Sequence, residues 1–153
     1  MQRFHTISAL ISAFALAACA SPSAALDFHS PAGWNAGPSI MGVVQLWTDP
    51  KNAHSVVMLM RVPASAANQD SALRERYLQK GRVVSDRQIT ICGNHAAHFS
   101  IIEGSGKSGR KSRAELINTA WNGTTYLALY GYDLGQPPDR NAENAIKSIC
   151  LKK

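Results

Sequence analysis

The stretch that decides the fold is residues 113–132, RAELINTAWNGTTYLALYGY. At its centre, Asn122-Gly123 is a preferred dipeptide of two-residue type I′ turns, in which both residues need a positive φ. In residues 126–132 every second residue is a tyrosine or an alanine, so these side chains fall on one face, as in a half-buried strand. Residues 116–117, Leu-Ile, fit a helix or a strand. Because a two-residue hairpin needs a strand on both sides, we predict strands on either side of the turn.

Outward from this hairpin, the sequence predicts five more strands and two helices. The strands are apolar and β-branched runs bounded by turn residues, and they cover residues 26–29, 40–48, 55–62, 83–92 and 96–102. The helices have apolar residues at helical spacing, over residues 66–80 and from Asp139 to Ile149. Hairpins combined with only two helices predict an α+β fold, a central antiparallel β-sheet flanked by helices, in a single domain over residues 26–153.

Residues 1–18 have the layout of a secretory signal peptide. Arg3 supplies a positive charge, and residues 7–18 are a run of apolar and small side chains. This run is too short to span a bilayer comfortably. It ends in residues 16–19, Leu-Ala-Ala-Cys, which resemble the lipobox of bacterial lipoproteins. The resemblance implies that the signal is removed just before Cys19.

The lipobox resemblance also implies a membrane anchor at Cys19. In that family the cysteine carries diacylglycerol and its new amine is acylated, and two or more acyl chains such as palmitate hold a protein stably in a membrane. Residues 19–25 then form a lipidated tether at the cell envelope. Because Ala20 rather than Asp follows the cysteine, the expected location in a host with two membranes is the outer membrane, facing the periplasm. The alternative is an ordinary signal, cut after Ala18 or Ala20.

The charge balance favours an acidic partner. The formal net charge is +6, and removing the signal lowers it by one. A basic exported protein is attracted to lipid headgroups, anionic polymers or an acidic protein, and its charge alone does not indicate nucleic acid. Residues 104–108, Gly-Ser-Gly-Lys-Ser, are similar to the end of a nucleotide-binding P-loop, but that motif needs a glycine where this chain has Ile101. We therefore expect no nucleotide, nucleic acid or cofactor.

Four cations lie within seven residues of the same glycine-rich loop, and they are Lys107, Arg110, Lys111 and Arg113. A charge run of this kind is usually a solvated loop. The sharper hypothesis is a finger that binds an envelope protein or an anionic surface. Near an anionic membrane, each cation would contribute about 1 kcal/mol.

The remaining cysteines, Cys92 and Cys150, form an even pair in an oxidising compartment. We predict a disulfide between them, which the chain-entropy model values at ~4 kcal/mol. The alternatives are two reduced thiols or a metal pair, although cysteines this far apart without a Cys-x-x-Cys motif are a poor zinc signal. His95 and His98 would point to opposite faces of a strand, and we therefore expect no metal site.

No catalytic group is assembled in the sequence. A Gly-x-Ser-x-Gly nucleophile motif is missing, and the Ser-x-x-Lys tetrad at residues 108–111 lies in a charged glycine loop. Glu103 and Glu115 are separated by that loop and are not interpreted as a carboxylate pair. We therefore predict a protein that is not an enzyme, with no catalytic residues.

Several short segments together resemble exported domains of the PsbP/Mog1-like fold. They are ITICGNHAAHFSI (89–101), GTTYLALYGYD (123–133), AIKSIC (145–150) and FHSPAGW (28–34). The resemblance spans roughly residues 26–151 and implies an antiparallel sheet flanked by helices, in which Cys92 could reach Cys150. Members of that family are mostly non-catalytic adaptors, assembly factors and binders.

The sequence therefore predicts a membrane-anchored exported lipoprotein that acts as a non-catalytic binding or assembly module at the cell envelope. Two alternatives remain open. One is a carrier of a small apolar or lipidic ligand held between sheet and helix, and the other is an unrecognised hydrolase.

Overall fold

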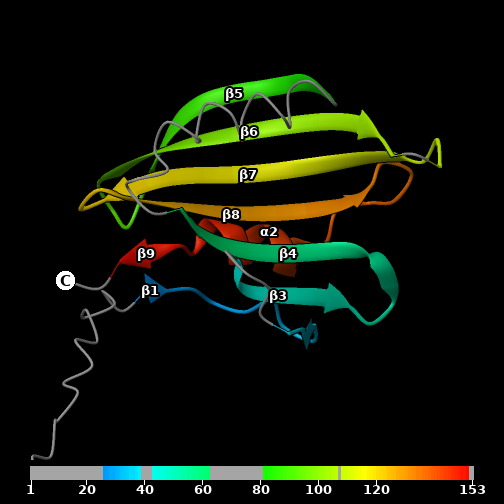
Figure 1. The fold of residues 1–153 in the computed structure, drawn as a ribbon, viewed down its shortest axis with the longest axis horizontal. Coiled ribbons are helices and arrows are strands. Elements are labelled where there is room, and N and C mark those ends of the chain that lie inside the picture. Colours follow the sequence, from blue (N-terminus) through cyan, green and yellow to red (C-terminus); the bar gives the residue numbers. More distant parts are fainter. Residues whose placement is uncertain (1–25, 39–42, 63–80, 107, 152–153) are drawn as a thin grey trace, which may run out of the picture.

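A computed structural model describes residues 26–38, 43–62, 81–106 and 108–151. The predicted helix over residues 66–80 and the predicted anchor at Cys19 lie outside these ranges. The elements in chain order are β1 (Leu26–Asp27), β2 (Asn35–Ala36), β3 (Val43–Asp49), β4 (Asn52–Val62), β5 (Gly81–Ile91), β6 (His95–Ser105), β7 (Lys111–Trp121), β8 (Thr124–Asp133), α2 (Arg140–Lys147) and β9 (Cys150–Leu151) (Figure 1).

Seven strands form one antiparallel sheet in the order β2-β3-β4-β8-β7-β6-β5. Most neighbours are also consecutive in the chain, because short turns connect antiparallel strands directly. The exception is the pairing of β4 with β8, which joins the two halves of the sheet. A second, two-stranded sheet pairs β1 with β9, so that the first and last described elements lie side by side.

The hairpin predicted over residues 113–132 is confirmed. β7 and β8 pair from Ser112↔Asp133 to Trp121↔Thr124, without a register shift. Asn122 has a φ of 47° and Gly123 a φ of 74°, as a type I′ turn requires. The turn therefore decides the ambiguous Leu116-Ile117 segment in favour of a strand.

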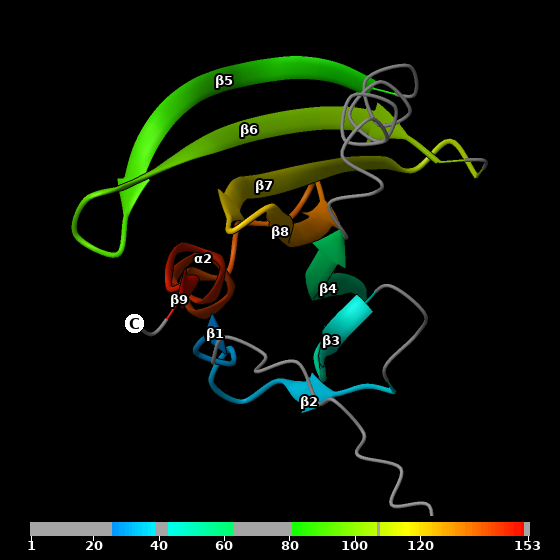
Figure 2. The same cartoon turned by 60° about the vertical axis from the view of Figure 1, so that its left-hand side comes forward.

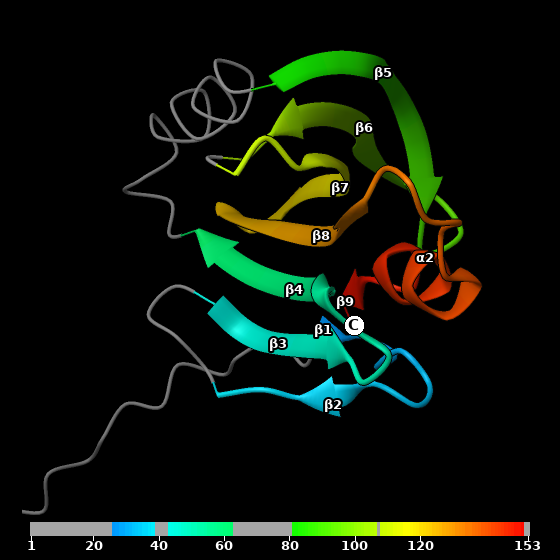
Figure 3. The ribbon, with the colours of Figure 1, turned by 90° about the vertical axis from the view of Figure 1, so that its right-hand side faces the viewer.

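The predicted sheet flanked by helices is wrong. The described chain is mostly β, and the one helix in its described part, α2, has eight residues. The long sheet curls, and α2 lies on its concave side (Figures 2 and 3). Twist and curvature let the sheet wrap much of the core by itself, and α2 is the helix that the described part of the chain adds to this face.

The predicted helix from Asp139 is confirmed. The Asp139 carboxylate accepts a hydrogen bond of 2.7 Å from the backbone N–H of Asn141, which satisfies one of the free donors at a helix start. Ala142, Ala145 and Ile146 are its buried stripe, and the apolar face of α2 therefore points into the concave side of the sheet.

The main core lies between α2 and the concave face. Ile117 and Ala128 of the sheet and Ala142, Ile146 and Ile149 of the α2 segment are all fully buried. A smaller cluster on the opposite face contains Ile102, Leu116 and Leu129. The two clusters follow from the two-residue alternation of β-strands, with Leu116 facing one side and Ile117 the other.

Candidate functional site

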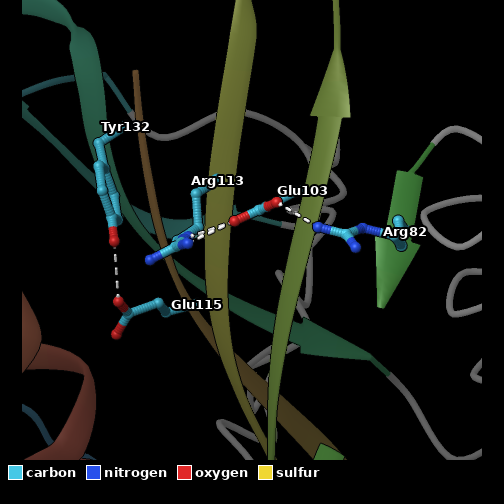
Figure 4. Close-up of polar contacts among 5 residues, drawn as sticks. All are labelled: Arg82, Glu103, Arg113, Glu115 and Tyr132. Carbon is cyan, nitrogen blue, oxygen red and sulfur yellow. Dashed lines mark hydrogen bonds and ion pairs between the residues drawn. The ribbon is translucent and has the colours of Figure 1, made fainter. Parts of the chain in front are cut away.

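A row of three charged side chains and a tyrosine crosses the concave face at one end of the sheet. In register, Arg82 of β5 pairs with Glu103 of β6, Glu103 with Arg113 of β7, and Arg113 with Tyr132 of β8. Side chains directly opposite one another on neighbouring antiparallel strands lie on the same face and can interact. The sheet register therefore assembles this row from four strands (Figure 4).

Glu103 is held between two arginines. Its Oε2 accepts a hydrogen bond of 3.1 Å from Nη2 of Arg82, and its Oε1 accepts one of 3.0 Å from Nε of Arg113. Nη2 of Arg113 also donates to Oε1. The hydrogen bonds from Arg113 and then Arg82 lower the pKa of the Glu103 carboxyl, because they favour its charged form. Glu103 in turn raises the pKa of Arg113.

Glu115 lies on the same face, two residues beyond Arg113 on β7, and only 6% of it is exposed. The hydroxyl of Tyr132 donates a hydrogen bond of 3.1 Å to its Oε1. Burial raises the pKa of the Glu115 carboxyl, and the bond from Tyr132 opposes this shift. Glu103 and Glu115 are therefore two carboxyls in contrasting environments, Glu103 bound by Arg113 and Glu115 by Tyr132 (Figure 4).

Two tyrosines of β8 support the inner end of the row. The rings of Tyr130 and Tyr132 stack with their centroids 4.6 Å apart. The Tyr130 hydroxyl accepts a hydrogen bond of 2.8 Å from the backbone N–H of Asp139, and burial raises the pKa of Tyr130 to about 12. The start of α2 is thereby fixed against the strand that holds Tyr132.

Sequence reasoning missed this pair of carboxyls. It treated Glu103 and Glu115 as separated by a loop, whereas the β6–β7 hairpin brings them to one face. The usable signal was the alternation within the hairpin. Starting from the pair Ser105 and Lys111 beside the turn, one step of two residues along each strand places Glu103 opposite Arg113. The next step places Ile101 opposite Glu115.

The four predicted loop cations are not one cluster. Lys107 lies outside the described residues. Nε of Arg110 lies 3.9 Å from Oδ1 of Asp133, and Lys111 is exposed at the start of β7. Arg113 instead points onto the concave face, where Glu103 holds it. Only Arg110 and Lys111 are therefore described as exposed cations of the hairpin end.

That hairpin end is a tight turn. The N–H of Gly106 donates to the carbonyl of Arg110 at 2.9 Å, and the N–H of Gly109 donates to the carbonyl of Gly106 at 3.0 Å. Gly109 has a φ of 73°, which a residue without a Cβ adopts readily. The turn therefore gives Arg110 and Lys111 a defined place at the end of the β6–β7 hairpin.

The two histidines of the H-x-x-H motif do not meet. The ring of His95 stacks on Trp121 with centroids 4.0 Å apart, on the side of the main core. Nδ1 of His98 lies 3.2 Å from Oδ1 of Asp86, a carboxylate that also accepts a hydrogen bond from Ser100. In the described part of the chain, no three potential metal-ligating side chains gather around one point.

Cys92 and Cys150 lie together at the other end of the sheet. Their Cα atoms are 5.4 Å apart, within the range that a disulfide needs. Cys92 follows β5 in the turn to β6, and Cys150 begins β9. The disulfide therefore remains a prediction with suitable geometry. Of the helices that the structure describes, none is long and apolar enough to cross a membrane.

No family model and no curated protein matches the sequence. Among solved structures, a protein from Bacteroides thetaiotaomicron is similar, with 17% sequence identity and a TM-score of 0.58 over 84% of this chain. The chain spans 45% of that protein's length. At this identity the likeness concerns the fold alone. The resemblances to lipoproteins and to PsbP/Mog1-like domains stay predictions.

Proposed function

We propose that the chain is an exported lipoprotein, anchored at Cys19, that acts as a non-catalytic binding module at the cell envelope. Its contact surface is the end of the β6–β7 hairpin. The observation that supports this choice is the contrast between two sets of cations. Arg82 and Arg113 are engaged by Glu103, whereas at the hairpin end Arg110 has a long contact of 3.9 Å to Asp133 and Lys111 is exposed.

This contrast changes how the hairpin should be tested. Reversing the charge of Arg113 would place two carboxylates against each other on the sheet, and a loss of binding could then reflect misfolding. The informative variant is Arg110→Glu with Lys111→Glu. Its matched control is Arg110→Lys with Lys111→Arg, which keeps both charges.

The test is cross-linking and pull-down from native envelopes with the lipidated protein. We expect an acidic protein to be recovered with the wild type and the charge-conserving control, and to be lost with the charge-reversed variant. Recovery that is equal for all three proteins would contradict the role of the hairpin. Mass spectrometry of the same samples reports whether Cys19 carries lipid. The predicted anchor is thereby tested separately from the predicted partner.

A second candidate, a hydrolase, is favoured by one observation. Glu103 and Glu115 share a face and have pKa values shifted in opposite directions, a pattern used by acid and base pairs in enzymes. Against it, both carboxyls have internal partners. Screening ester, glycoside and peptide substrates with Glu115→Gln beside the wild type tests it, since an enzyme using this acid would lose activity in the variant.

The carrier alternative finds no support between the sheet and α2. Tyr130, Ile117 and Ile146 fill that space and are essentially fully buried. Close-packed side chains of this kind leave no room for a ligand without repacking.

A further inference from the structure

Leu26, where the predicted tether joins the domain, and the basic hairpin lie at opposite ends of the described domain. Leu26, the first residue after the tether, pairs with Leu151 in the β1–β9 sheet, and Asp27 pairs with Cys150. Cys150 lies against Cys92 in the β5–β6 turn. β6 then runs from this turn to Ser105 at the opposite end, where Arg110 and Lys111 are found (Figure 1).

Further contacts fix the anchored end. The backbone N–H of His29 donates to the Ser148 hydroxyl at 2.8 Å, and the indole N–H of Trp34 donates to the Asp139 carboxylate at 3.3 Å. These contacts join the segment after β1 to both ends of α2. The predicted tether therefore joins the domain next to a segment that is held in place by these contacts.

The distances decide which end can face the membrane. An eleven-residue strand such as β6 spans roughly 30–36 Å, at ~3.3 Å per residue and allowing for its curvature. The seven tether residues, 19–25, reach at most ~25 Å when fully extended. An upright domain therefore cannot turn its hairpin onto the bilayer that holds Cys19.

Only a domain lying flat would bring both ends to the same bilayer, and the charges give little reason for it. Arg110 and Lys111 would together contribute about 2 kcal/mol beside an anionic surface. Arg110 is already near Asp133, which weakens its attraction to an anionic surface. This attraction would also have to offset the orientational freedom that a flat domain loses.

We propose that the β6–β7 hairpin is an outward-facing docking surface, and that its partner is an acidic protein surface rather than the headgroups of the anchoring membrane. The inference rests on the proposed anchor at Cys19. The mixture of Arg110 and Lys111 with Asp133 fits a protein of complementary charge pattern, since such patterns select partners, better than a uniform polyanion.

The orientation can be measured on the full lipidated protein in vesicles of phosphatidylcholine and phosphatidylglycerol. A short-range donor dye is attached to Ser108→Cys, in the hairpin turn, or to Ala120→Cys, at the other end of β7. Both positions are exposed. With an acceptor on the lipid headgroups, we expect several-fold less transfer from position 108 than from position 120. Equal or greater transfer from position 108 would overturn the proposal.

Two further readouts separate the possible failures. Flotation with vesicles and the mass of the protein show whether Cys19 carries a lipid anchor, with Cys19→Ser as the control. A protein without lipid would refute the proposed function and with it this inference. Anionic vesicles that carry no protein are then added to the vesicles that carry the anchored protein. They test whether the outward-facing hairpin binds lipid of a second membrane. We expect no clustering of vesicles. Clustering that is lost with Arg110→Glu and Lys111→Glu would overturn the choice of a protein partner.

Discussion

The Tyr132 hydroxyl on β8 donates a hydrogen bond to Glu115, a buried acid on the neighbouring strand β7. Burial raises the pKa of the Glu115 carboxyl, and this bond is the largest of the contributions that oppose the shift. Arg113 lies on the same strand, while Glu143 and Lys147 of α2 act on the carboxyl from the other side with opposite signs. Several elements thus determine when Glu115 ionises.

The first prediction concerns Glu115 and pH. Its pKa is raised above the ordinary 4.5, so between these two values the folded state holds a proton that the unfolded state has released. The free energy of unfolding should therefore fall as pH rises through this window. Urea unfolding from about pH 4 to about pH 8 should show this fall in the wild type and a flatter profile in Glu115→Gln.

Tyr132→Phe provides the matched control for this prediction. It removes the donor that favours ionised Glu115, so the fall should extend to a higher pH than in the wild type. An unchanged profile in both variants would mean that Glu115 does not govern the pH dependence.

The second prediction concerns Glu103, for which the sign is reversed. Arg113 and Arg82 lower its pKa below 4.5, so its stabilising contribution is complete above pH 4.5 and is lost as pH falls through the lowered pKa. Glu103→Gln should be less stable than the wild type at neutral pH, and the difference should shrink in acid. Arg82→Gln should have a weaker effect, because Arg82 is largely exposed. Thermal unfolding against pH measures both.

The third prediction concerns the cysteine pair. Oxidation should leave no free thiol at Cys92 or Cys150, and intact mass before and after reduction checks this. Replacing both by serine should lower the free energy of unfolding by about 2–5 kcal/mol. Free thiols in the native exported protein, together with an unchanged stability of the double variant, would argue for two reduced cysteines.

The fourth prediction concerns the packing of α2. Ile146 is fully buried between the helix and the sheet, so Ile146→Ala should lower the free energy of unfolding by about 2–5 kcal/mol. Asn144→Ala, at an exposed position of the same helix, is the control and should change little. Equal effects of the two substitutions would indicate that α2 does not seal the core.

Local signals identified the β7–β8 hairpin and the start of α2. Asn122-Gly123 fixed both the β7–β8 turn and the strand assignment of Leu116 and Ile117, because few other dipeptides suit two positive φ values. Asp139 likewise marked the start of α2. These elements were predictable because their causes lie within a few residues.

The architecture and the candidate site were not predictable in the same way. The pairing of β4 with β8 joins residues far apart in the chain, and the curl of the sheet depends on all its strands. The sequence therefore did not show that one short helix could cover the concave face. Arg113 was grouped with the loop cations because its charge is visible in the sequence, whereas its direction depends on the register with Glu103.

The pairing of β1 with β9 sets an order of events during biosynthesis. The first described strand finds its only described sheet partner in residues 150–151, which are synthesised after all the strands of the large sheet. Until they emerge, α2 has no β9 behind it, and Cys92 has no thiol opposite. Local hairpins can form earlier, since their partners are close in sequence. The β1–β9 pairing therefore forms only after the strands of the large sheet have been synthesised, and a chain cut before Cys150 loses this pairing.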